Sequence, residues 1–168
     1  MNIRQALTAE NSKRQATAIA GYIGEDPKRF AELMDVFFSG EYRLTQRAAW
    51  PLNFCAQRNS SLIFPYLDRL IDLLADNSAH DAVRRNIVRV MQFVDIPSEL
   101  EGKAFDMCVN LVDDDTQAVA IRAFAMTVAA RIAKDEPDLL NELRLIAEKH
   151  LPNATAAFRS RAKRILCI

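Results

Sequence analysis

The chain has 168 residues, of which 50% are hydrophobic and 26% are charged, and this composition excludes an intrinsically disordered protein. Its 22 Lys and Arg residues balance 22 Asp and Glu residues, so no bulk charge indicates binding to nucleic acid or to a membrane. No apolar stretch reaches the roughly 18 residues that a membrane span needs. The first residues also lack the apolar core of a secretory signal peptide. We therefore expect a cytoplasmic protein that forms one domain over residues 1–168.

The cysteines favour the same compartment. Cys55, Cys108 and Cys167 are odd in number, lie far apart, and each falls in an apolar, helix-forming run. This pattern is typical of buried free thiols in a reducing cytoplasm rather than of disulfides or a metal site.

Hydrophobic residues recur at spacings of three and four along most of the chain, which predicts an all-α protein. Asp26 before Pro27 is a strong helix start, and Gly24 and Gly40 are natural stops. In chain order, we expect helices at about 11–23, 27–38, 41–56, 60–75, 81–93, 98–113, 116–133, 137–150 and 155–167. Pro51 lies inside the third of these, where it should kink the helix.

An arginine heads an apolar helical run at regular intervals. Arg47, Arg85, Arg122 and Arg161 follow one another at steps of 38, 37 and 39 residues. A period in the high thirties is typical of an array of helical hairpins, in which each pair buries its apolar stripe only by stacking on its neighbours. We predict four hairpins at about 27–60, 61–97, 98–136 and 137–168, preceded by an N-terminal half unit at 1–26.

The second helices of these hairpins carry a local signature, seen as VRRNI at 83–87, IRAFA at 121–125 and FRSRA at 158–162. With paired helices of this length and a proline inside one of them, the chain resembles HEAT-type repeats, such as those of small bacterial helical-repeat proteins. The resemblance implies a right-handed αα superhelix, a solenoid of the HEAT and armadillo kind. The resemblance therefore predicts the fold but says little about the activity.

The recurrent arginines have two interpretations. In HEAT-type arrays an acid near the turn pairs with an arginine early in the second helix, and Glu41, Asp81 and Asp115 precede three of the four arginines here. Such a ladder would be structural. Alternatively, the arginines belong to a basic face, because the second-helix segments sum to +7 and the first-helix segments to −7. In a solenoid the second helices usually line the concave face, so this face would attract an anionic partner.

We therefore expect a binding scaffold without catalytic activity, which receives an acidic segment of another protein on its concave, second-helix face. A weak nucleic-acid binder is the alternative. The candidate binding residues share a place on, or beside, the second-helix layer: Arg47, Arg85, Arg122, Arg159, Arg161, Lys163, Arg164 and Trp50.

One enzyme class has a related fold. The chain resembles DNA-alkylation-repair glycosylases at the level of fold, and this resemblance implies an aromatic residue beside an acid on the concave face. Trp50 is the natural counterpart, but Phe54 stands one turn later where a carboxylate is needed, so Trp50 is better explained as a core residue. Neither His80 nor His150 has metal-ligand neighbours, and the Asp113–Asp115 run fits a turn. We expect no cofactor and no metal.

Overall fold

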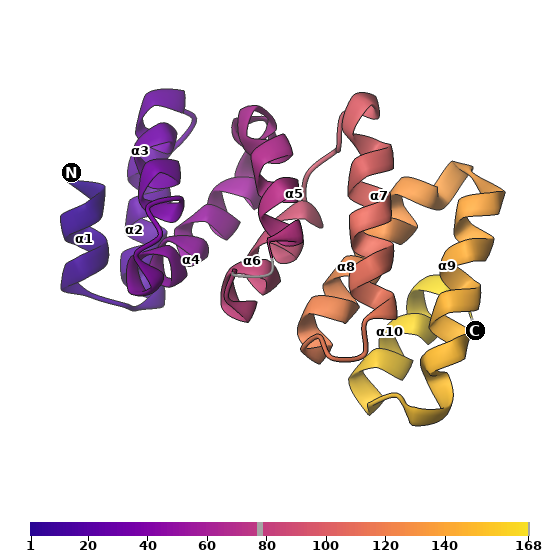
Figure 1. The fold of residues 1–168 in the computed structure, drawn as a ribbon. Helices are drawn as coiled ribbons and strands as arrows, with labels where there is room; N and C mark the ends of the chain where they lie inside the picture. The colour runs from indigo at the N-terminus through magenta and orange to yellow at the C-terminus, as the bar shows by residue number, and fades with distance from the viewer. Residues whose placement is uncertain (77–78, 168) are drawn as a thin grey trace. The chain divides into compact units, whose positions relative to one another are not determined.

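The computed structural model describes residues 1–76 and 79–167, and within these ranges it is all-α, without strands. Figure 1 shows the helices in chain order. The described residues contain ten α-helices: α1 (Ile3–Ala9), α2 (Lys13–Ile23), α3 (Pro27–Phe37), α4 (Tyr42–Arg58), α5 (Leu67–Ala75), α6 (Asp81–Met91), α7 (Ser98–Asp113), α8 (Val119–Ile132), α9 (Pro137–His150) and α10 (Ala156–Leu166). Three 3-10 turns join them: η1 (Ser60–Tyr66), η2 (Ala133–Asp135) and η3 (Leu151–Asn153).

Several helices begin where the sequence supplies a capping side chain. The side chain of Ser12 accepts from the backbone N of Gln15, and Thr155 caps α10 in the same way through Phe158. Asp26 caps α3 by accepting from two backbone amides, with Pro27 at the first helical position. Such caps satisfy amides that have no partner within the helix.

The chain divides into two compact units, 1–65 with 93–95, and 66–92 with 96–168. In the first unit α1 contacts α2 and α3, while α4 packs along both α2 and α3. Its core contains Ile19, Phe30, Leu33, Phe37 and Leu52, none more than 1% exposed.

Residues 1–26 form two helices, α1 and α2, where the sequence pattern predicts one. The seven residues of α1 are too few to show a clear periodicity.

The second unit is built as two layers of helices. The first helices lie in the order α5, α7, α9, and the second helices in the order α6, α8, α10, so α8 is flanked by α6 and α10. The hairpin partners α7 and α8 have the most extensive contact. Figure 1 shows α8 and α10 behind α7 and α9. Buried Phe105, Val112, Ile121, Met126 and Phe158 fill the space between the layers.

Two helix starts differ from the expected bounds. Residues 60–66 form a 3-10 turn instead of the first turns of α5, because Pro65 cannot donate a backbone hydrogen bond. Helix α8 begins at Val119 rather than at Thr116. Asp114 accepts from the backbone N and the hydroxyl of Thr116, and this turn delays the helix. Among the described residues, no helix is long and apolar enough to cross a membrane.

Candidate interaction surface

The two helix layers of the second unit differ sharply in charge. Helices α6, α8 and α10 together carry nine Lys and Arg residues and a single acid, Asp81. Helices α5, α7 and α9 carry nine acids and four Lys and Arg residues. The zero net charge of the chain therefore hides a separation of charge between the layers.

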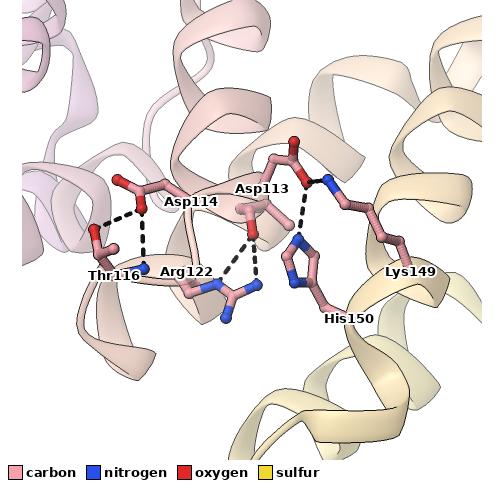
Figure 2. A network of polar contacts seen from close by, with 7 residues as sticks. Asp113, Asp114, Thr116, Arg122, Lys149 and His150 are labelled. Atoms are coloured by element: carbon pink, nitrogen blue, oxygen red, sulfur yellow. Dashed lines mark hydrogen bonds and ion pairs between the residues drawn. The ribbon is translucent and has the colours of Figure 1, made fainter.

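In the first-helix layer, ion pairs between neighbouring hairpins neutralise part of the acidic charge. The Nζ of Lys103 on α7 lies 2.5 Å from Asp68 and 2.6 Å from Asp72, both on α5. Asp113 at the end of α7 accepts from Lys149 at 2.7 Å and contacts the Nε2 of His150 at 2.8 Å, both on α9 (Figure 2). These hydrogen bonds hold the pKa of the Asp113 carboxyl below its ordinary value, because they favour the charged form.

In the second-helix layer, Arg84, Arg122 and Arg159 donate to backbone carbonyls rather than to acids. Arg84 donates to the carbonyl of Asp76 at 2.8 Å, just past the end of α5. Arg122 donates to the carbonyl of Val112 through Nε at 3.0 Å and Nη2 at 2.8 Å (Figure 2). Arg159 donates to the carbonyls of Leu151 and Pro152, each at 3.1 Å. The carbonyl of Val112 is one that the end of α7 leaves without a backbone donor, whereas the carbonyls of Asp76 and Leu151 also accept from the backbone N of Ala79 and of Ala154.

This arrangement corrects the expected ladder of arginines and acids. Arg47 donates to the carbonyls of Leu7 and Thr8 at 2.9 Å, and Glu41 pairs with Arg4 instead. Within the described residues, Asp81 and Asp115 form no ion pair with Arg85 and Arg122. A carbonyl accepts a hydrogen bond but carries no formal charge. The arginines that cap helix ends therefore keep their full positive charge within the layer.

Two further contacts tie the second helices to one another. Arg131 on α8 donates to the carbonyls of Met91 and Gln92 at the end of α6. Arg161 on α10 donates to the hydroxyl of Thr127 on α8 at 2.8 Å, and its guanidinium lies 5.7 Å from the centre of the Phe124 ring. Burial and the nearby charge of Arg164 both lower the pKa of Arg161. Arg161 and Arg164 therefore lie close together on the side of α10 that reaches over α8.

The solvent-facing side of this layer combines free cations with an apolar strip. On α6, Arg85 and Arg89 are exposed one turn apart, and neither forms a hydrogen bond or ion pair through its side chain with any described residue. Arg164 on α10 is exposed as well, and its side chain forms no hydrogen bond or ion pair with any described residue. Between them, α8 presents side chains that are only half-buried. We define the open face as Arg85, Arg89, Ala120, Phe124, Thr127, Arg161 and Arg164.

The family model described as HEAT repeat domain matches residues 3–168. The chain belongs to the HEAT repeat domain family. HEAT repeats generally act as scaffolds for interactions between proteins, and the family is generally non-enzymatic. Comparison with curated proteins gave no match, and neither did comparison with solved structures.

In this HEAT repeat domain, the residues singled out from the sequence do not form one cluster. Arg85, Arg161 and Arg164 share the open face. Lys163 stands two residues after Arg161, which places it on another side of α10, and Arg159 is turned toward the η3 turn that it caps. Arg122 is only 8% exposed and faces away from the open face.

Arg47 and Trp50 belong to the first unit. Trp50 is 37% exposed on α4, so the core position expected for it is wrong, and Phe54 one turn later is half-buried. Position 54, one turn after Trp50, holds a phenylalanine, so the acid that a glycosylase-like site requires is missing at this position.

Sequence reasoning missed three residues of this layer, Arg84, Arg89 and Arg131. The pair Arg84–Arg85 shows why, since the repeat spacing fits either residue and only burial separates them.

The three cysteines differ in exposure. Cys55 and Cys108 are buried and free, as expected, whereas Cys167 is free but exposed. No group of three or more His, Cys, Asp or Glu residues in the described ranges is placed to hold a metal ion.

Proposed function

We propose that this HEAT repeat domain is a non-catalytic binding scaffold whose open face receives an acidic segment of another protein. One observation carries the proposal. In the described part of the second-helix layer, several arginines are bound to neutral carbonyls, and Arg85, Arg89 and Arg164 form no side-chain hydrogen bond or ion pair. In the first-helix layer, Asp68, Asp72 and Asp113 are paired with cations. An acidic segment would supply the counter-charge that the chain itself does not provide.

The strip along α8 favours a protein segment over a nucleic-acid backbone. Ala120, Phe124 and Thr127 offer a narrow apolar surface between Arg85 and Arg89 on one side and Arg161 and Arg164 on the other. An amphipathic helix with a hydrophobic stripe between two acidic edges complements this pattern, and helices commonly dock in this way. A phosphate backbone would contact the cations but would leave the apolar strip uncovered.

We also propose a cytoplasmic location, which the free thiols support.

The test measures the binding of a synthetic acidic amphipathic peptide of about 16 residues, roughly 24 Å long when helical. We compare the native chain with the double variant Arg85→Glu/Arg89→Glu. The matched control is Lys28→Glu/Lys134→Glu, which changes the net charge equally at exposed positions outside the open face. We expect the first variant to weaken binding about tenfold or more and the control to weaken it at most about threefold. Equal losses would contradict a specific face.

Random duplex DNA serves as the competitor that tests nucleic-acid binding. Affinity for DNA that exceeds affinity for the peptide, with a steep dependence on salt, would favour that alternative and contradict the proposal. Incubation with alkylated DNA tests the glycosylase-like alternative, and we expect no release of a damaged base.

A further inference from the structure

A polar hollow of about 300 Å³ lies at the turn end of the second unit, apart from the open face. It forms where the turn between α7 and α8 meets the turn between α9 and α10. Its lining includes Gln117, Arg122, Asn153, Thr155 and Phe158, together with two charged side chains, Asp115 and Lys149. Apart from Val119, Ala154 and Phe158, the residues that line it are polar or charged, so the hollow is suited to a hydrophilic group.

Arg122 lines this hollow and has one edge of its guanidinium without a partner among the described residues. Its Nε and Nη2 donate to the carbonyl of Val112, and its flat face lies 4.6 Å from the centre of the Phe158 ring. Nη1 donates to no described residue. The side chain is 8% exposed, and its burial lowers the pKa of the guanidinium. A buried arginine without a paired carboxylate is poorly compensated, because water no longer solvates its charge fully.

Two of the nearby aspartates, Asp113 and Asp114, are held by other partners, as Figure 2 shows, whereas Asp115 lines the hollow itself. Asp113 is bound to Lys149 and His150, and Asp114 accepts from Thr116 and from the Nε2 of Gln117 at 2.7 Å. None of them forms an ion pair with Arg122. Their negative charges still act on the hollow, since Asp113, Asp114 and Asp115 each raise the pKa of Arg122. Both the attraction to Arg122 and the repulsion by these acids grow with the charge of an anion, so the planar fit to the guanidinium edge has to select the ligand.

We propose that the hollow is a binding site for a single carboxylate group. The Nη1–Nη2 edge of Arg122 matches the two oxygens of a carboxylate in a planar, paired geometry. Thr155 accepts from the backbone N of Phe158 through its hydroxyl oxygen, which leaves its hydroxyl hydrogen to donate to the ligand. Asn153 is exposed at the rim, and its amide forms no hydrogen bond with a described residue. The carboxylate comes from a chain terminus, from an acidic side chain, or from a small free acid.

The experiment follows backbone amide resonances of the full chain by NMR during titration with acetate. We expect saturable shifts confined to Gln117, Asn153, Thr155 and their neighbours. Inorganic phosphate at a pH where it is doubly charged should bind more weakly. Absent or non-saturable shifts, or tighter binding of phosphate than of acetate, would overturn the proposal.

Three further probes identify the source of the carboxylate. A short peptide with a free C-terminus, the same peptide amidated, and the amidated peptide with one internal Glu are titrated in parallel. Tightest binding of the free C-terminus assigns the site to a chain terminus, and tightest binding of the Glu peptide assigns it to a side chain. Acetate binding without binding of any peptide assigns it to a small free acid.

Two arginine-to-lysine variants distinguish binding by the guanidinium edge of Arg122 from attraction by positive charge alone. Arg122→Lys keeps the charge but loses the planar edge, so we expect acetate affinity to fall about tenfold. The control Arg159→Lys makes the same change at a carbonyl-capping arginine whose contacts lie on the η3 turn. It should leave the affinity within about twofold. If Arg122→Lys does not fold, Asn153→Ala decides, and an unchanged affinity in that exposed variant contradicts the site.

Discussion

Arg84 and Arg85 are neighbours in the chain but have opposite surroundings. Arg84 is 7% exposed and binds the carbonyl of Asp76 and the side chain of Gln117, whereas Arg85 extends into solvent. A helix rotates by about 100° per residue, so adjacent positions face different environments. One of these arginines therefore stabilises the hairpin, and the other is available to a partner.

The pair yields a direct comparison of stabilities. Arg84→Ala leaves the carbonyl of Asp76 without this donor and opens a gap in the core, so we expect a loss of about 1–3 kcal/mol in the free energy of unfolding. Arg85→Ala should change it by no more than about 0.5 kcal/mol. Urea unfolding of both variants measures the difference. A larger loss for Arg85→Ala would contradict the assignment of the two residues.

The three thiols should differ in reactivity with a thiol reagent. Burial raises the pKa of Cys55 to about 11 and that of Cys108 to about 12, so both remain protonated and shielded at pH 8. Cys167 is exposed after the last turn of α10. We expect one thiol to react rapidly in the native protein and all three to react in urea. Rapid native labelling of Cys108 would contradict its position in the core.

At the scale of elements, long-range side-chain contacts hold short helices in place. Helix α1 has only seven residues, which is too short to be stable alone. Arg47 on α4 donates to two carbonyls at its end, and Arg4 pairs with Glu41. The first helix of the array is thus fixed from α4, about forty residues away in the chain, which no local pattern announces.

Loss of the Arg47 contact should loosen α1 in particular. We expect Arg47→Ala to raise amide hydrogen exchange in α1 several-fold while α3 stays protected, since the free energy of local opening falls. Arg43→Ala, an exposed arginine on the same helix, is the control and should leave α1 unchanged. Equal exchange in both variants would show that Arg47 does not hold α1.

The link between α7 and α9 should depend on pH. The folded state holds the pKa of Asp113 below its ordinary value. Its contribution is therefore present above about pH 4 and is lost as the pH falls through the folded-state pKa. Asp113 is partly exposed, so we expect Asp113→Asn to cost no more than about 1 kcal/mol at pH 7. Unfolding at pH 7 and at about pH 3 measures this, and a loss that is as large in acid would contradict the ion pair.

At the scale of the whole molecule, much of the architecture was predictable and the contacts were not. Periodic apolar residues and caps such as Asp26–Pro27 placed nine of the helices, because both are local features. The opposite charges of the two layers also follow from the sequence once the hairpins are assigned. The partners of the arginines cannot be predicted from the sequence, since any residue can supply a carbonyl at a helix end. Glu41 and Asp81 suggested ion pairs with Arg47 and Arg85, and the described residues do not form these pairs.

The position of the bound segment tests the central claim most directly. Hydrogen–deuterium exchange of the full chain, with and without the acidic amphipathic peptide, reports which helices the peptide covers. The open face predicts added protection in α6, α8 and α10 that is absent in Arg85→Glu/Arg89→Glu. Protection in α5, α7 and α9 instead, or no protection at saturating peptide, would contradict it.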